Sequence, residues 1–173
     1  SVILGIAHCI EDYSIEKSVV LLRTLLIHDD TDIIVRAARS LLVIARSGKI
    51  VKEFGEPFID EMKQIANRCY ALHMFHSILP KYENGMLIRD HLLNEQRKSV
   101  QVLLRLSILH IPDTPIESYI QYILSNNETR IPFVIEFLDS SCDKDVRPLI
   151  LPLIDTDVDP ASIGQELFSG IPK

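Results

Sequence analysis

Apolar residues recur every three or four positions along most of the chain, which is the repeat of an amphipathic α-helix. Runs of alternating apolar and polar residues, typical of half-buried strands, are absent, and glycine is scarce. The pattern therefore predicts an all-α fold. The expected helices span residues 14–28, 31–47, 57–79, 86–110, 115–124, 128–140, 145–154 and 160–168.

Cap residues and prolines set the expected helix ends. Ser14 and Thr31 each precede an apolar stripe, so their hydroxyl groups are predicted to cap the first two helices. Asp32 is expected in the first turn of the second helix, where the helix dipole favours a carboxylate. Pro148 and Pro152 should leave the helix at 145–154 kinked or partly irregular. The apolar stripe of the second helix consists of Ile34, Ala38, Leu41, Leu42 and Ala45.

One short pattern occurs twice and indicates an internal repeat. Asp32-x-x-Val35-Arg36 returns 111 residues later as Asp143-x-x-Val146-Arg147, each time directly after a polar turn. Each copy is expected to open the second helix of a hairpin. The offset equals about three units of 37 residues, close to the roughly 40 to 47 residues of a HEAT repeat. We therefore expect one domain, residues 1–173, built as an α-α superhelix of about four hairpins, a HEAT/armadillo-like solenoid.

Composition and charge narrow the classes of function. The net charge of −6 and a sequence pI near 5.5 argue against nucleic acid as a partner. Three widely spaced cysteines suit a reducing, cytoplasmic compartment, and no segment is long and apolar enough for a membrane span. No nucleophile elbow, phosphate-binding glycine loop or zinc-protease motif occurs, which predicts a protein without enzymatic activity. The apolar start at 1–9 and the Gly- and Pro-containing end at 169–173 suggest a fragment of a longer chain.

Three segments between about Leu87 and Ile154 occur in a fixed order: a Leu-rich run at 102–109, a Glu-x-Leu-Asp helix end at 136–139 and a Leu-Pro-Leu run at 150–154. In this order they resemble the helical region that follows the transmembrane part of bacterial nucleotide-transporter-like proteins of the ADP/ATP translocase type. The resemblance implies a cytosolic HEAT domain tethered to a membrane by a segment that this sequence lacks, sometimes followed by a cyclic-nucleotide-binding domain. It implies no catalysis and no cofactor.

Two residue groups have the spacing of metal ligands. Cys69, His73 and His76 fall on one face of a predicted helix and could offer a thiolate and two imidazoles to zinc. The competing interpretation is a buried cysteine beside ordinary histidines, because no fourth ligand is indicated and Cys69 lies on the apolar stripe.

The second group is an acidic loop. Asp155, Asp157, Asp159 and Glu166 occupy positions one, three, five and twelve of a would-be calcium loop. Position six, which needs glycine, is Pro160. The competing interpretation is an acidic turn in which Asp159 caps a helix that begins at Pro160.

Arg36, Arg39 and Arg46 fall near one face of the second helix and form the candidate interaction surface. Either they bind an anionic partner, or they pair with acids of the neighbouring hairpin. With no catalytic constellation, the sequence favours an interaction scaffold whose partner is a protein segment or another domain of the same chain. The alternative hypothesis is a metal- or ligand-sensing domain that uses Cys69, His73 and His76, or the acidic loop at Asp155.

Overall fold

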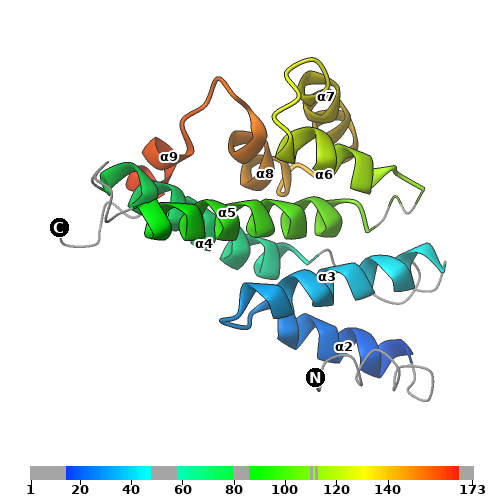
Figure 1. The fold of residues 1–173 in the computed structure, drawn as a ribbon. Coiled ribbons are helices and arrows are strands. Elements are labelled where there is room, and N and C mark those ends of the chain that lie inside the picture. The colour runs from blue at the N-terminus through cyan, green and yellow to red at the C-terminus, as the bar shows by residue number, and fades with distance from the viewer. Residues whose placement is uncertain (1–14, 48–57, 80–85, 110, 112, 168–173) are drawn as a thin grey trace.

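The computed structural model describes residues 15–47, 58–79, 86–109, 111 and 113–167, and within them all regular secondary structure is helical (Figure 1). The predicted all-α class is therefore confirmed for this part of the chain. The predicted cap at Ser14, the predicted helix start at residue 57 and the two chain ends lie outside the described residues. The helices are α2 (Ile15–Leu26), α3 (Thr31–Arg46), α4 (Ile59–Ile78), α5 (Met86–Ser107), α6 (Ile116–Leu124), α7 (Ile131–Ser141), α8 (Arg147–Ile154) and α9 (Pro160–Leu167).

The first four helices form two hairpins, α2 with α3 and α4 with α5, and the pairs lie against each other (Figure 1). α2 and α4 run in the same direction. Arg23 of α2 bonds Glu61 near the start of α4 at 2.7 Å, and Arg68, further along α4, donates at 2.7 Å to the carbonyl of Asp29 in the turn after α2. α3 and α5 also run in the same direction. Asp32 in the first turn of α3 pairs with Lys98 of α5, and Arg46 in the last turn of α3 bonds Thr114 in the turn that follows α5. The second hairpin therefore repeats the orientation of the first.

The central helix of the molecule is α5, which contacts α3, α4, α6 and α8. Every residue from Val102 to Leu109 is buried, so this part of the chain is enclosed on all sides. The Leu-rich composition of this run fits that position, because each side chain removed from water contributes about 1.5–3 kcal/mol when it is a leucine or isoleucine. The α4–α5 hairpin is thus covered by α3 on one side and by α6 and α8 on the other.

Two prolines lie in α8, which begins at Arg147 rather than at residue 145 as expected. Pro148 lies in the first turn, where no amide donor is needed, and the helix continues to Ile154 with Pro152 inside it. Pro152 has no amide hydrogen, so it cannot bond the carbonyl of Pro148 four residues earlier. The Tyr70 hydroxyl of α4 donates to that carbonyl at 3.5 Å. Tyr70 is buried, which raises the pKa of its phenol to about 12 and keeps it a donor.

The predicted helix caps are corrected at α3. Asp30, with extended backbone angles, is the N-cap, and its carboxylate accepts from the Asp32 amide at 2.8 Å. Thr31, expected to be the cap, is instead the first helical residue and is buried. Asp32 lies in the first turn of α3, as predicted.

The two copies of the Asp-x-x-Val-Arg pattern do not occupy the same helical register. Asp143 lies outside the first turn of α8, which begins at Arg147, so this expectation is wrong. The Asp143 carbonyl accepts from the amides of Val146 and Arg147, and the Asp30 carbonyl accepts likewise from the amides three and four residues after it. Cap geometry therefore pairs Asp143 with Asp30, not with Asp32. The sequence match was offset by two residues from the structural one.

α9 packs on α4 through a close approach at Gly164. A Cβ atom added to Gly164 would lie 2.7 Å from the backbone oxygen of Tyr70 and 3.5 Å from the Cβ of Met74. A backbone oxygen cannot move aside as a flexible side chain can, so the contact requires glycine unless α9 shifts.

We expect Gly164→Ala to weaken the docking of α9 on α4. Alanine normally stabilises a helix interior relative to glycine by about 0.5–1 kcal/mol, but the steric conflict should reverse the sign and cost about 1–2 kcal/mol. Hydrogen–deuterium exchange should become faster in residues 160–167, and the urea midpoint should fall. Gln165→Ala, an exposed position on the same helix, is the matched control and should leave both unchanged. Equal behaviour of the two variants would contradict the close contact.

Candidate interaction surface on α3

The exposed face of α3 carries the three predicted arginines. Arg36, Arg39 and Arg46 are all exposed, and Val43 between them leaves 69% of its surface accessible to solvent. At 100° per residue these four positions fall within an arc of about 80° on the helix. We call them the α3 arginine stripe. The opposite side of α3 is buried against α2 and α5, which fixes the stripe toward solvent.

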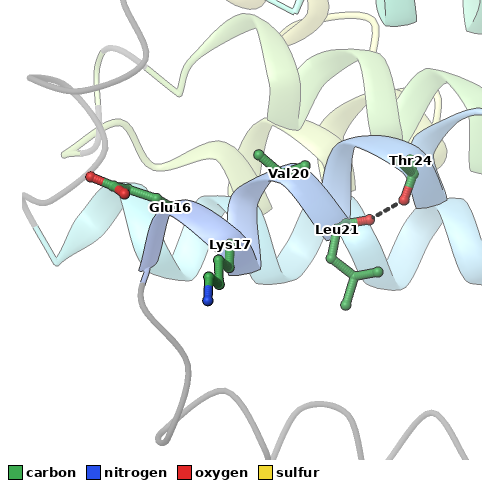
Figure 2. A pocket seen from close by; sticks show the side chains of 5 residues that line it. All are labelled: Glu16, Lys17, Val20, Leu21 and Thr24. Atoms are coloured by element: carbon green, nitrogen blue, oxygen red, sulfur yellow. Dashed lines mark hydrogen bonds between the residues drawn. The ribbon is translucent and has the colours of Figure 1, made fainter.

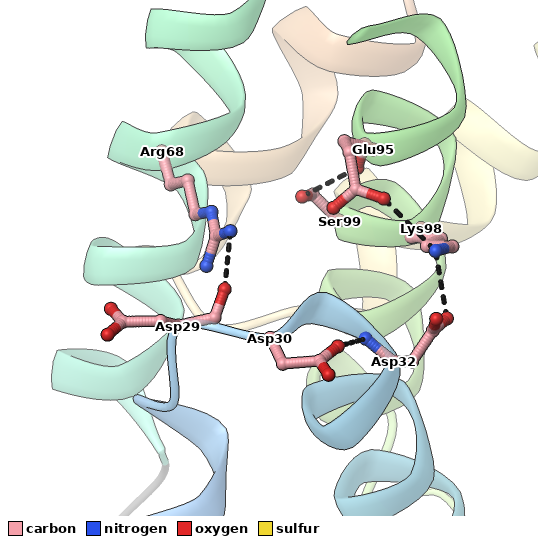
Figure 3. Close-up of polar contacts among 7 residues, drawn as sticks. All are labelled: Asp29, Asp30, Asp32, Arg68, Glu95, Lys98 and Ser99. Carbon is pink, nitrogen blue, oxygen red and sulfur yellow. Dashed lines mark hydrogen bonds and ion pairs between the residues drawn. The ribbon is translucent and has the colours of Figure 1, made fainter. Parts of the chain in front are cut away.

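An ion-pair cluster lies at the first turn of α3, just before the α3 arginine stripe (Figure 3). The Lys98 ammonium of α5 lies 2.8 Å from Asp32 and 3.0 Å from Glu95. The hydrogen bond from Lys98 is the largest cause that lowers the pKa of Asp32, and the bond to Asp32 raises the pKa of Lys98. On the other side of the α2–α3 turn, Arg68 of α4 holds the carbonyl of Asp29 (Figure 3). The turn is thus tied to both helices of the second hairpin.

The lowered pKa of Asp32 gives a pH-dependent contribution to stability. A carboxyl group whose pKa is lower in the folded than in the unfolded chain stabilises the fold above the unfolded pKa and loses this contribution as pH falls through the folded pKa. Asp32→Asn should therefore lower the free energy of unfolding at pH 7 by less than about 1 kcal/mol, since the Asp32 side chain is 65% exposed. Near pH 2 the variant and the parent protein should unfold at the same urea concentration.

The control for this prediction is Asp29→Asn. Asp29 takes part through its backbone carbonyl, which asparagine retains. Its variant should match the parent protein at both pH values. A stability difference for Asp32→Asn that persists at pH 2 would show that the charge is not its source.

The three arginines differ in their contacts. Arg46 donates to the backbone carbonyl of Thr114 in the turn between α5 and α6 at 3.3 Å. Within the described part of the chain, Arg36 and Arg39 form neither a hydrogen bond nor an ion pair, although Arg36 contributes to the field that lowers the pKa of Asp32. The alternative was that the three arginines pair with acids of the neighbouring hairpin. Among the described residues, Arg36 and Arg39 form no such pair.

The proposed zinc ligands do not form a metal site in the described residues. Among them, no three His, Cys, Asp or Glu side chains gather closely enough to hold an ion. Cys69 is fully buried, its thiol donates to the Gln96 carbonyl across 3.8 Å, and burial raises its pKa to about 12. A zinc ligand must be a thiolate, which this environment disfavours. Burial also lowers the pKa of His73 and of His76.

The acidic loop forms turn and cap hydrogen bonds. Asp159 accepts from the Ala161 amide at 3.1 Å and from the Ser162 hydroxyl at 2.7 Å, and the Ser162 bond is the largest cause of its lowered pKa. Asp155 accepts from the Asp157 amide at 3.0 Å. Asp159 therefore caps α9, which begins at Pro160, as the interpretation of an acidic turn predicts.

Sequence reasoning missed an ion pair between the buried Arg105 of α5 and the exposed Glu117 of α6. Arg105 leaves 1% of its surface exposed, and its guanidinium forms two bonds with Glu117, at 3.1 Å and 2.9 Å. A third donor reaches the Gln101 carbonyl at 3.3 Å. A charged residue inside a Leu-rich run was the available signal. The pair joins the end of α5 to the start of α6. Its role is therefore structural.

An open depression also lies on α2, lined by Glu16, Lys17, Val20, Leu21 and Thr24 (Figure 2). All five lining residues come from this one helix. The depression therefore brings together no groups from different elements. The Thr24 hydroxyl donates to the Leu21 carbonyl of the same helix. We assign it no chemistry.

Comparison with known proteins adds no relative. A scan against protein-family models and searches of the curated proteins and of the solved structures found no match to this chain. In the described residues, no helix combines the length and the apolar character needed to cross a membrane.

Proposed function

We propose that this chain is a non-catalytic scaffold of the HEAT/armadillo type that binds a protein segment or another domain of its own polypeptide. The observation that carries the proposal is the arrangement of the first two hairpins, which lie in the same orientation and leave the α3 arginine stripe in solvent. In α-solenoids each hairpin buries its apolar face against its neighbours, and the exposed helix faces bind partners. The first two hairpins pack in this way through α3 and α5, and the polar contacts of Asp29 and Asp32 join the same two hairpins.

The helices α6 and α8 pack on the second hairpin and extend the core beyond it. α6 contacts α5, and α8 contacts both α4 and α5, so a third group of helices covers the far side of the second hairpin (Figure 1). The order of helices in this group differs from that of the first two hairpins, because α8 rather than α6 reaches α4. The proposal therefore assigns regular stacking to α2–α5 and a terminating arrangement to α6–α9, as is common at the ends of repeat domains.

The resemblance of residues 87–154 to the helical region of nucleotide-transporter-like proteins supplies a cellular context for the proposal. It would place the chain on the cytosolic side of a membrane protein, where a scaffold domain contacts a neighbouring domain or a soluble partner. Cytoplasmic exposure also agrees with the two described cysteines, Cys69 and Cys142, which are buried free thiols.

The scaffold function is tested by isolating a partner. The intact chain is immobilised, and a protein that it retains from a cell extract is identified and purified. The binding of this protein to the chain is then measured by isothermal titration calorimetry. A stoichiometric complex without chemical change of either protein is expected. Elemental analysis of the same preparation tests the metal-sensing alternative: one zinc or calcium ion per chain, with partner binding absent, would overturn the scaffold proposal.

A further inference from the structure

The α3 arginine stripe has the dimensions of a helix-sized contact. Its four positions are separated by three, four and three residues, so they follow one another along about 15 Å of α3. The outer positions are cationic and Val43 interrupts them with an apolar surface that is 69% exposed. The stripe therefore combines positive charge with one exposed apolar position.

The charge of the stripe is opposite to that of the chain. The whole sequence carries −6, yet the acid nearest the stripe, Asp32, is held by Lys98 at 2.8 Å and so is already paired. Arg36 and Arg39, which form no ion pair or hydrogen bond among the described residues, present their guanidinium groups to solvent. Guanidinium groups bind carboxylates in two-point contacts, which favours an acidic ligand.

The apolar position selects among acidic ligands. A nucleic acid offers phosphates along its whole length, and the net charge of −6 opposes binding of so long a polyanion more than binding of a helix with three carboxylates. Phe, Tyr and Trp, on which bases stack, are absent from α3. A helix with carboxylates at i, i+3 and i+10 and an apolar residue at i+7 matches both features of the stripe.

We infer that the α3 arginine stripe binds an acidic amphipathic helix of a partner protein, with carboxylates on Arg36 and Arg39 and an apolar side chain on Val43. The inference rests on the scaffold function proposed above and specifies its surface and the chemistry of its ligand. Arg46, anchored to the Thr114 carbonyl, borders the far end of the contact.

The test uses three labelled probes with the intact chain. The first is an 18-residue alanine-based helical peptide with glutamate at i, i+3 and i+10 and leucine at i+7. The second replaces the glutamates by glutamine, and the third is an 18-nucleotide single-stranded DNA. Fluorescence anisotropy should show saturable binding of the first peptide, weakened by added salt, and binding at least about tenfold weaker for the other two probes.

Matched variants locate the contact. Arg36→Gln/Arg39→Gln should weaken the acidic peptide about tenfold or more, and Val43→Ser should weaken it severalfold. The control Arg130→Gln/Lys144→Gln removes the same charge at exposed positions near α7 and α8 and should change affinity less than about twofold. All variants should keep the parent circular-dichroism spectrum and melting temperature, because the substituted side chains are exposed.

The outcomes separate this inference from the scaffold function. Failure of the acidic peptide to bind, equal loss in the control variant, or preferred binding of DNA would each overturn the inference. A purified natural partner that binds Arg36→Gln/Arg39→Gln as tightly as the parent protein would overturn it while leaving the scaffold function intact. Partner binding that falls with the peptide's affinity would support both.

Discussion

Leu41→Ala should lower the free energy of unfolding by about 2–5 kcal/mol, the range for truncating a buried leucine. Leu41 is fully buried in the middle of α3, which lies between α2 and α5. Alanine would leave a cavity that three packed helices can close only in part, so the loss includes both transfer energy and unfilled volume. Urea unfolding monitored by circular dichroism measures the change, with the slope expected to stay constant.

Two variants on the same helix control this prediction. Leu41→Met keeps the volume and apolar character of the side chain and should cost less than about 1.5 kcal/mol. Val43→Ala, only two residues away but largely exposed, should cost at most about 0.5 kcal/mol. A similar loss for Leu41→Ala and Val43→Ala would mean that the buried and exposed faces of α3 are assigned incorrectly.

The helices could be predicted because each is encoded locally. α3 illustrates this: its buried positions repeat at the helical period, and all five predicted stripe residues are buried. The ends were less certain. α7 begins at Ile131 rather than near Glu128, because residues 128–130 form a turn whose Arg130 amide bonds the Asn127 side chain. Short polar segments allow several cap arrangements, and packing selects one.

Contacts between distant helices could not be predicted from the same pattern. Nothing in the helical pattern distinguishes Gly164, and only the position of α9 on α4 shows that its missing side chain admits the Tyr70 backbone. The repeated Asp-x-x-Val-Arg pattern failed for a related reason, since Asp143 precedes a separate turn before α8 begins. Sequence similarity between the two copies does not encode where each helix starts.

The candidate site was predicted in its exposure but not in its partners. Arg36, Arg39 and Arg46 lie on one exposed face, as helical spacing required. Arg105 of α5 is buried instead, although arginine is normally an exposed residue. What distinguishes it is the neighbour: α6 folds back over the end of α5 and brings Glu117 to its guanidinium, a contact that depends on the turn between them.

This ion pair leads to an unequal effect of removing its two members. Glu117→Ala would leave the Arg105 guanidinium almost fully buried without its carboxylate and should cost about 2–3 kcal/mol. The expected loss lies below that for a fully buried pair because the Glu117 side chain is 56% exposed and partly solvated. Arg105→Met breaks the same pair but removes the buried charge and keeps an apolar stem, so it should cost at most about 1 kcal/mol.

A double-mutant cycle decides whether the buried charge is the cause. If Glu117 acts on stability through Arg105, then Arg105→Met/Glu117→Ala should be close in stability to Arg105→Met alone, and the coupling energy should nearly equal the cost of Glu117→Ala. Urea unfolding of the four proteins gives each value. A single Arg105→Met variant less stable than Glu117→Ala would contradict this account and would show that the Arg105 side chain stabilises the α5–α6 junction mainly through its bond to the Gln101 carbonyl and its packing.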